Sequence, residues 1–456
     1  MTWGEKLAFG AGPIGKNISS SLVYGSFLSL YFMQTLGINP AFLSVMFFLC
    51  RIWDGVNDLL MGAVIDATHS RFGKFRPWIF FGAVSNALCA VLIYWNPGLH
   101  GVGLYVYVTV LYLLCDLTFT MIDVAYWAMI PALTLDRKER DQVSVIPRLT
   151  GAIGGAVGAF TLNLVDLLGG RGQNAGYLHY AMLTGVIYIA TSTLCAAKCQ
   201  ERVQSLQVSG ERFSLIRAAK VLAGNDQALT VVVIMLLFNA ANCVTTAVLL
   251  YYFLYVLDKG SFYGTFTILT GLLQGIGLLG FPLLSKKVDR NRIYLAAYLL
   301  PVLGYALMAL VSVAAPQNLV LFLPASALPF ISYGAMGVME NVMLADAVDY
   351  GEWKTGFRNE GIIFSMLTFL SKIANGVAQG VTFAAFAIVG FNAEADVAPT
   401  PQAVLSFKIL LFAVPMVFLL LAALVHKRKF LLKPALTQTI SAELQSRRTA
   451  AAEPEG

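Results

Sequence analysis

The chain has 456 residues, of which 58% are hydrophobic and 12% are charged. Water-soluble domains are about 45–50% apolar and about 25% charged, so the composition excludes an ordinary soluble fold. The net charge of +6 does not indicate a nucleic-acid-binding protein, because no basic region with interleaved aromatic residues lies outside the apolar segments.

Twelve apolar segments follow one another along the chain, and each is long enough to cross a hydrocarbon core about 30 Å thick. They cover residues 8–36, 40–66, 77–97, 102–133, 146–169, 177–197, 227–257, 262–285, 293–315, 318–348, 361–391 and 402–426. No small-residue cleavage site follows the first segment, so we expect it to remain as a membrane span. The pattern predicts an all-α membrane protein with twelve transmembrane helices in two six-helix halves, which is a transporter architecture.

Polar stretches divide the chain into four parts. Residues 1–197 and 227–426 form the N-terminal and C-terminal six-helix halves, and residues 198–226 form a central cytosolic linker with acidic and basic side chains. Residues 427–456 form a cytosolic tail that begins with three basic residues and ends in a polar run, which we expect to be disordered.

Lysine and arginine residues gather in alternate loops and thereby predict the orientation. The loops after the second, fourth, eighth and tenth segments hold Arg71, Lys74, Arg76, Arg137, Lys138, Arg140, Lys286, Lys287, Arg290, Arg292, Lys354 and Arg358. The central linker after the sixth segment is basic as well, whereas the odd-numbered loops and their edges hold only Arg171, Lys259 and Lys408. Because basic loops stay in the cytosol, we expect both termini there, in a multi-pass protein of a bacterial inner (plasma) membrane.

Small residues predict close helix packing in the fifth segment. Gly151, Gly154, Gly155 and Gly158 include two GxxxG spacings, and no strand precedes them, so packing against a neighbouring helix is favoured over phosphate binding. The six cysteines have neither a disulfide pattern nor zinc-ligand spacing. We expect no cofactor apart from a co-transported ion.

The second segment carries charged residues where lipid makes them costly, by roughly 2.5 to more than 10 kcal/mol each. Asp54 and Asp58 lie one helical turn apart and point the same way, with Arg51 and Asn57 beside them. Two such carboxylates repel each other unless a cation sits between them. Together with Thr120 they offer hard oxygen ligands, which predicts a sodium site at Asp54 and Asp58, with a proton as the competing ion.

Polar stripes on other segments predict a neighbouring sugar site. In the fourth segment, Asp116, Thr120, Asp123 and Trp127 share one face; Lys16, Asn17, Ser20 and Tyr24 do so in the first, and Ser365, Thr368, Lys372, Asn375 and Gln379 in the eleventh. A carboxylate such as Asp123 accepts hydrogen bonds from sugar hydroxyls, while the indole of Trp127 covers the apolar side of a sugar ring. Arg148 and Lys372 are able to donate to ring oxygens or to balance the acids.

At residues 51–58, 70–78, 121–123, 134–140 and 349–354 the sequence resembles the glycoside–pentoside–hexuronide:cation symporters of the major facilitator superfamily, and among them the melibiose permeases. The resemblance covers nearly the whole chain and implies the major facilitator type of fold. Several motifs in the same order make this a specific signal.

The resemblance also implies roles for individual residues. Asp54 and Asp58 match the cation-site carboxylates, with Asn57 and Thr120 at positions that help to bind sodium. Positions that line the sugar cavity correspond to Lys16, Asn17, Asp123, Trp127, Arg148, Thr368 and Lys372, and the cytosolic gating loop corresponds to Arg71, Lys74 and Arg76. Departures from the family are Asn17, Phe119, Gly337 and Leu367 in place of aspartate, tyrosine, tryptophan and glutamine, and the additional acids Asp116 and Glu340.

These features predict a secondary active symporter rather than an enzyme. It couples inward movement of sodium, or of a proton, to uptake of a glycoside or oligosaccharide such as a galactoside. Its partners are a small sugar, a monovalent cation and the lipid bilayer, and nucleic acid is not among them. Alternatives are a proton-coupled hexuronide or pentoside symporter and a lysolipid or drug carrier on the same fold; a sugar sensor would need a signalling domain, for which residues 427–456 are too short and polar.

Overall fold

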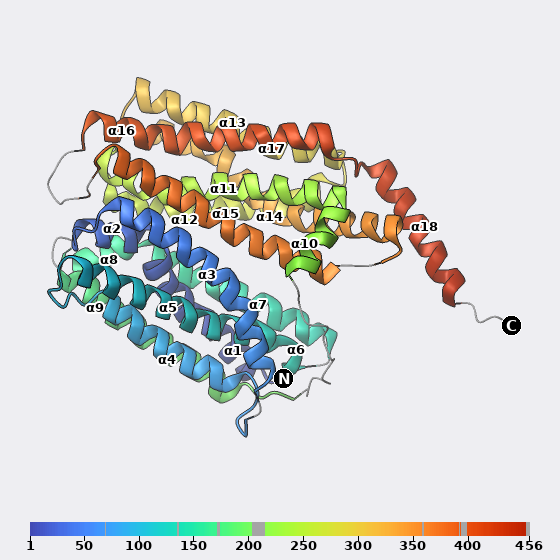
Figure 1. The fold of residues 1–456 in the computed structure, drawn as a ribbon, viewed down its shortest axis with the longest axis horizontal. Coiled ribbons are helices and arrows are strands. Elements are labelled where there is room, and N and C mark those ends of the chain that lie inside the picture. The colour runs from blue at the N-terminus through green and yellow to red at the C-terminus, as the bar shows by residue number, and fades with distance from the viewer. Residues whose placement is uncertain are drawn as a thin grey trace.

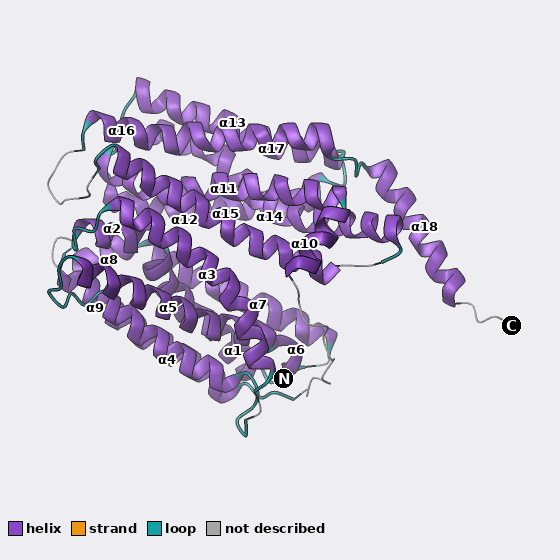
Figure 2. Ribbon diagram, viewed as in Figure 1, coloured by secondary structure: helices purple, strands orange, loops and turns teal. Residues whose placement is uncertain are grey.

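The computed structural model describes residues 1–68, 70–134, 136–170, 174–202, 215–357, 360–391, 393 and 399–452. In these residues all the regular structure is helical, which confirms the all-α prediction (Figure 2). The helices form two bundles that lie side by side, one from each half of the sequence (Figure 1). We call the end of the bundles at which the N-terminus and α10 (Leu215–Gly224) lie the linker end, and the other the opposite end.

The six predicted N-terminal segments are all helical, and three of them are broken. They are α1 (Trp3–Tyr24) with α2 (Ser26–Gln34), α3 (Pro40–Asp66), α4 (Arg76–Ile93), α5 (Val102–Ala128) with α6 (Ile130–Leu133), α7 (Arg137–Ala159) with α8 (Thr161–Leu167), and α9 (Asn174–Lys198). Gly25 separates α1 from α2 because its backbone is extended, with φ −85° and ψ 179°. The axes of α7 and α8 are bent by 53°.

The C-terminal half repeats this arrangement. From residue 215 onward the elements are α10 (Leu215–Gly224), α11 (Asp226–Tyr255), the 3-10 turn Gly260–Phe262, α12 (Tyr263–Leu284), α13 (Arg290–Ala314), α14 (Leu319–Thr355), α15 (Glu360–Ile388), α16 (Pro401–Lys408), the π-helical turn Ile409–Ala413, α17 (Val414–Lys429) and, in the tail, α18 (Pro434–Ala452). Helix α10 belongs to the predicted linker, so part of the linker is helical.

The helices have the length and composition of membrane spans. Among the described residues, nine helical segments are long and apolar enough to cross a membrane, with α16 and α17 counted as one segment, and the bent pair α7–α8 makes a tenth. The pair α1–α2 and helix α3 complete the twelve; both carry interior charges, Lys16 in α1 and Arg51, Asp54 and Asp58 in α3, which lower their hydropathy. Large apolar side chains remain exposed along the spans, as expected of surfaces that face lipid.

The tail contains a helix where we expected disorder. Helix α18 lies against the linker end of α14, where Trp353 Nε1 donates to Glu443 Oε2 at 2.7 Å and Arg447 Nη1 donates to the Trp353 carbonyl at 3.2 Å. Ile440 and Leu444, one turn apart, are buried and give this helix an apolar side. The expectation of disorder is therefore wrong for residues 434–452.

Glycines bring α1 and α7 into close contact, as the GxxxG spacing predicts. A methyl group on Gly154 would collide with the backbone of Ile14, and one on Gly158 would collide with the side chain of Ser21. Gly155 points elsewhere and has open space around it. The contact fixes the polar stripe of α1 against the N-terminal half.

The two halves touch through α3 and α15 and again at the opposite end. Gly376 in α15 lies against Arg51, and Ser44 Oγ donates to the Gly380 carbonyl at 2.7 Å. Further hydrogen bonds join Ser26 Oγ to the Thr246 carbonyl at 3.1 Å, the Ser29 and Tyr251 hydroxyls at 2.8 Å, and Asn163 Nδ2 to the Ser261 carbonyl at 3.2 Å. These contacts hold the halves together away from the linker end.

Some residues used in the sequence analysis lie outside the described part. They are Arg171, Arg358 and residues 203–214, together with the side chains of Arg137, Lys138, Arg140 and Ser365.

Candidate functional site

Two carboxylates of α3 meet a lysine of α15 at the boundary between the halves. Lys372 Nζ lies 2.7 Å from Asp54 Oδ1 and 2.6 Å from Asp58 Oδ2, and it also donates to the Asp54 carbonyl at 3.4 Å. The Asp54 side chain is 11% exposed and the Asp58 side chain 33%. The ammonium group thus occupies the space between two like charges and neutralises part of their repulsion.

Other polar side chains surround this carboxylate pair. Arg51 Nη1 lies 3.4 Å from Asp54 Oδ2, and Thr120 Oγ1 on α5 donates to Asp58 Oδ1 at 3.4 Å. Helices α3 and α5 therefore lie side by side, as the predicted cation site requires. Two buried atoms nearby in sequence, Asn57 Nδ2 and Asp116 Oδ2, have no hydrogen-bond partner among the described residues.

A second cluster lies between α1 and α5, inside the N-terminal half. The Lys16 ammonium pairs with Asp123 Oδ1, and Trp127 Nε1 donates to the same oxygen at 3.2 Å. Lys16 Nζ lies 5.4, 5.6 and 5.8 Å from the ring centres of Trp127, Tyr126 and Phe119. Both donors use Oδ1, so the described residues leave Asp123 Oδ2 free, and this side chain is 36% exposed. The cluster offers an outside molecule a carboxylate oxygen and an aromatic face.

The remaining residues predicted to bind sugar are placed differently. Asn17 Nδ2 donates to the Gly151 carbonyl at 2.9 Å, so this amide joins α1 to α7. Thr368 is exposed and its hydroxyl donates to the Phe364 carbonyl of its own helix at 3.1 Å. Arg148 on α7 is exposed. Lys372, which the sequence allowed either to contact sugar or to balance the acids, lies with Asp54 and Asp58 rather than with Asp123.

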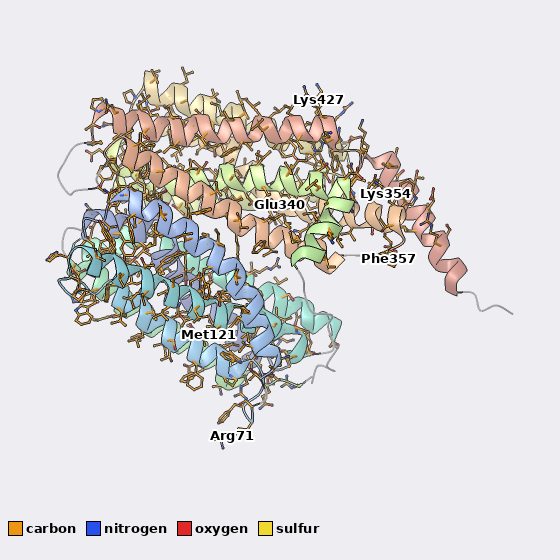
Figure 3. The ribbon with its side chains drawn as sticks, in the orientation of Figure 1. Arg71, Met121, Glu340, Lys354, Phe357 and Lys427 are labelled. Carbon is orange, nitrogen blue, oxygen red and sulfur yellow. The ribbon has the colours of Figure 1, made fainter. Side chains whose placement is uncertain are left out.

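The predicted gating loop between α3 and α4 is organised by an acid of the linker. Glu201 accepts hydrogen bonds from the backbone N–H groups of Lys74, Phe75 and Arg76 at 2.7, 2.8 and 3.2 Å. Gly73 has φ +102°, and a side chain there would strike the Glu201 carboxylate. Arg71 projects from the loop away from the bundle (Figure 3).

Sequence reasoning did not identify Glu201, because its partners lie more than 120 residues away and no local pattern marks such a contact. Arg76 strengthens the same junction, since its Nε donates to the Ala196 carbonyl at 2.5 Å.

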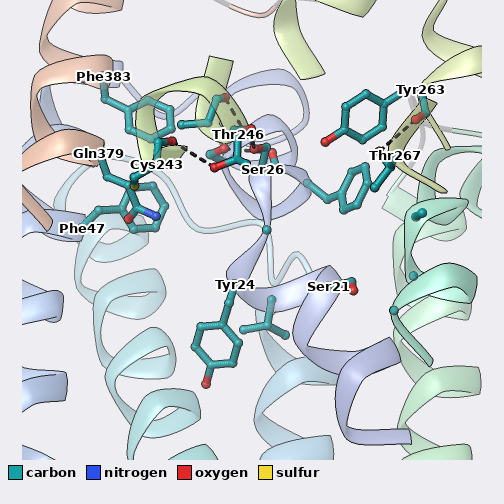
Figure 4. A pocket seen from close by; sticks show the side chains of 18 of the residues that line it. Ser21, Tyr24, Ser26, Phe47, Cys243, Thr246, Tyr263, Thr267, Gln379 and Phe383 are labelled. Carbon is teal, nitrogen blue, oxygen red and sulfur yellow. Dashed lines mark hydrogen bonds between the residues drawn. The ribbon is translucent and has the colours of Figure 1, made fainter. Parts of the chain in front are cut away.

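A cavity of about 230 Å³ lies between the halves at the opposite end (Figure 4). Its lining combines hydroxyl and amide groups with aromatic rings, and includes Ser26, Phe47, Thr246, Tyr263, Gln379 and Phe383. Tyr24, at the end of α1, also lines it and belongs to the polar stripe that contains Lys16. None of the predicted sugar-binding side chains lines this cavity.

Known structures share this fold. The chain is similar to a nucleoside transporter, NupG, with a TM-score of 0.65 over 91% of this chain and 98% of that one at 13% identity. It is also similar to the xylose transporter XylE from E. coli in a partially occluded inward open conformation, with a TM-score of 0.59 over 95% and 98% of the two chains at 12% identity. These solved structures show the fold, which the chain shares with both transporters.

The family model described as MFS/sugar transport protein matches residues 8–430, so the chain belongs to this family. This membership confirms the resemblance inferred from its motifs.

Curated relatives match nearly the whole chain. The lactose permease of Lactobacillus delbrueckii subsp. bulgaricus is 27% identical over 94% of this chain and 70% of its own length. The putative glycoside/cation symporter YagG of Escherichia coli is 26% identical over 99% and 97%, and the raffinose carrier protein of Pediococcus pentosaceus is 26% identical over 97% and 71%.

Proposed function

We propose that the protein is a secondary active symporter that couples inward movement of sodium, or of a proton, to uptake of a glycoside or oligosaccharide such as a galactoside. The observation that carries this proposal is the contact of Lys372 with both Asp54 and Asp58 across the boundary between the halves. The relatives named lactose permease, raffinose carrier protein and glycoside/cation symporter support the class of substrate and the coupling to a cation.

The cation binds at Asp54 and Asp58 and competes there with the Lys372 ammonium. Carboxylate and hydroxyl oxygens suit a hard ion such as sodium, and Thr120 already lies 3.4 Å from Asp58. A proton taken up by one of the carboxylates would weaken the same ion pairs. Because the acids belong to α3 and the lysine to α15, either ion releases a link between the halves, and the halves are then free to rock.

The sugar binds beside Asp123 and Trp127. Sugar hydroxyls donate to the free Oδ2 of Asp123, while the indole covers the apolar side of the ring. Lys16 holds the carboxylate in place through Oδ1. Arg148 and Thr368, both exposed, are available as further donors from the neighbouring helices α7 and α15.

The two sites share helix α5, which gives a physical route for coupling. Thr120 contacts the cation carboxylate Asp58 from α5, and Asp123 follows one turn later on the same helix. Cation binding that orders this turn raises sugar affinity, and by linkage sugar raises cation affinity by the same factor.

The driving force is sufficient for concentrative uptake. A potential of about 100 mV contributes roughly 2.3 kcal/mol per charge, and a tenfold ion gradient adds about 1.4 kcal/mol. Together they support accumulation on the order of several hundredfold.

In the membrane, we place the linker end in the cytosol. The basic loops that follow α3, α12 and α14 lie at this end, and basic loops are retained on the cytosolic side. Both termini are then cytosolic, in a bacterial inner membrane, and the tight contacts at the opposite end close the outer entrance.

Uptake by proteoliposomes tests the proposal. Labelled lactose, raffinose, isoprimeverose and a glucuronide are each offered with an inward sodium gradient, with an inward proton gradient, and with neither. Uptake of a neutral glycoside that rises with one ion gradient supports the proposal. Uptake of the glucuronide alone would favour a hexuronide symporter, and equal uptake under all three conditions would exclude ion coupling.

A further inference from the structure

Glu340 is a carboxylate inside the C-terminal half that the sites described above do not use (Figure 3). Its Oε1 accepts a hydrogen bond from Asn239 Nδ2 on α11 at 3.3 Å. No lysine or arginine forms an ion pair with it among the described residues. An acid at this depth is costly, and such residues normally face a cavity or a ligand.

The position of Glu340 in its half matches that of Asp123 in the other. Asp123 lies 21 residues after Val102, the first residue of α5, and Glu340 lies 21 residues after Leu319, the first residue of α14. Both helices are the fourth span of their half and start at the opposite end. Because the halves are repeats, the two acids lie at corresponding depths on corresponding helices.

The partners of the two acids correspond as well. Asp123 pairs with Lys16 on the first span of the N-terminal half, and Glu340 bonds with Asn239 on the first span of the C-terminal half. The charged Lys16 of the N-terminal half thus corresponds to the neutral amide of Asn239 in the C-terminal half. The carboxylate of Glu340 therefore has no cationic partner among the described residues.

The space one turn before Glu340, at Gly337, is open. Asn239 shares one face of α11 with Cys243 and Thr246, which line the cavity between the halves. Gly337, one turn before Glu340, is exposed, and a methyl group added there would meet nothing within 4 Å. Glu340 Oε2 accepts no hydrogen bond from the described residues. Unlike Asp116 Oδ2, which also has no partner, it is not completely buried.

We propose that Glu340 is a specificity-determining residue that binds hydroxyl groups of a second sugar unit, while Asp123 binds the first. Its Oε2 accepts from those hydroxyls, the space beside Gly337 holds the ring, and Asn239 is a positioning residue that orients the carboxylate. The substrate class is then a disaccharide or longer glycoside that reaches both halves, rather than a single pentose or hexose. This inference rests on the proposed function.

Equilibrium binding tests it with the sugar among lactose, raffinose and isoprimeverose that the wild-type protein takes up best, and with the one-ring methyl glycoside of the same sugar. Glu340→Gln keeps the side-chain volume and one oxygen that accepts from Asn239. It replaces the second carboxylate oxygen, Oε2, by an NH2 group that does not accept hydrogen bonds. We expect its Kd for the longer sugar to rise on the order of tenfold to a hundredfold. The Kd for the methyl glycoside and the cation dependence stay as in the wild type.

Two further variants keep the test decisive. Asn239→Ala should weaken binding of the longer sugar less than Glu340→Gln does and leave the methyl glycoside unaffected, a difference that a purely structural role would not produce. Glu443→Gln, the same change on α18, should bind both sugars as the wild type does.

Unchanged binding of the longer sugar by Glu340→Gln overturns the inference, as does loss of cation dependence with sugar affinity retained. If Asp123→Asn weakens binding in the same assay while Glu340→Gln does not, only this inference fails. If neither variant weakens binding, the proposed sugar site itself is wrong.

Discussion

The carboxylate pair and the Lys16–Asp123 cluster are both built from an acid and a lysine, but they differ in which helices they join. Lys372 reaches Asp54 and Asp58 from the other half of the molecule, whereas Lys16 reaches Asp123 within one half. The first ion pair must change when the halves move relative to each other, and the second is able to persist through the movement. The ion therefore binds at a contact that changes with the conformation, and the sugar binds at a contact that stays within one half.

The largest test of this difference removes a carboxylate from the contact between the halves. Asp54→Asn should lose concentrative uptake and fall from several hundredfold accumulation to equilibrium, because the cation loses a charged ligand. Facilitated equilibration of sugar should remain, since the Asp123 cluster is intact. Uptake into energised membrane vesicles measures both quantities.

Glu443→Gln, which removes an exposed carboxylate of α18, is the control and should accumulate sugar normally. Full accumulation by Asp54→Asn would show that the contact between the halves is not the ion site.

The next test removes the acid from the cluster within one half. Asp123→Asn should raise the Kd for sugar on the order of tenfold to a hundredfold, because a charged acceptor contributes about 1.5–3 kcal/mol to a hydrogen bond. Binding of the cation in the absence of sugar should change little. Calorimetric titration with sugar and with sodium chloride separates the two effects, and a variant that loses cation binding but keeps sugar affinity would reverse the assignment.

A third test disturbs the packing of α7 against α1, the helix that carries Lys16. Gly154→Ala places a methyl group against the Ile14 backbone and should lower the stability by about 1–3 kcal/mol, as overpacking does. Gly155→Ala, one residue further on, meets open space and serves as the matched control. Thermal unfolding in detergent compares them. Equal Tm values for the two variants would mean that α1 and α7 are not in close contact.

The smallest effect is expected at the linker, far from both clusters. Glu201→Gln keeps an oxygen for the N–H groups of Lys74, Phe75 and Arg76 but loses the charge that favours the start of α4. We expect a loss of about 0.3–1 kcal/mol at this helix N-terminus. Faster amide hydrogen exchange in residues 73–78, with unchanged exchange in α5, would agree, and protection as in the wild type would not.

Most of the fold follows from the length and spacing of the apolar segments. Each of the twelve predicted segments is helical, because about 20 apolar residues in lipid satisfy their backbone only as a helix. The break at Gly25 was not predictable, since the apolar run continues across it. The helix α18 was missed because, among its described side chains, only Ile440 and Leu444 are buried and give it an apolar side.

The sequence predicts which residues of the candidate site share a face of one helix, but it does not predict which residues of different helices are in contact. Helical periodicity shows that Asp54 and Asp58 share a face, and the structure places them with a common partner. Periodicity does not say which helix lies opposite, so the sequence left two roles open for Lys372. In the same way it does not reveal that the amide of Asn17 donates to the Gly151 carbonyl on α7.

The most direct test of the account is the Kd for sugar, measured across a range of sodium concentrations and again across a range of pH, in the wild-type protein and in Asp58→Asn. We predict that one of the two ions raises the sugar affinity of the wild type. The sugar affinity of Asp58→Asn should respond to neither ion, because the variant lacks the carboxylate that binds the ion in competition with Lys372. An ion-dependent affinity that persists undiminished in Asp58→Asn would contradict the account.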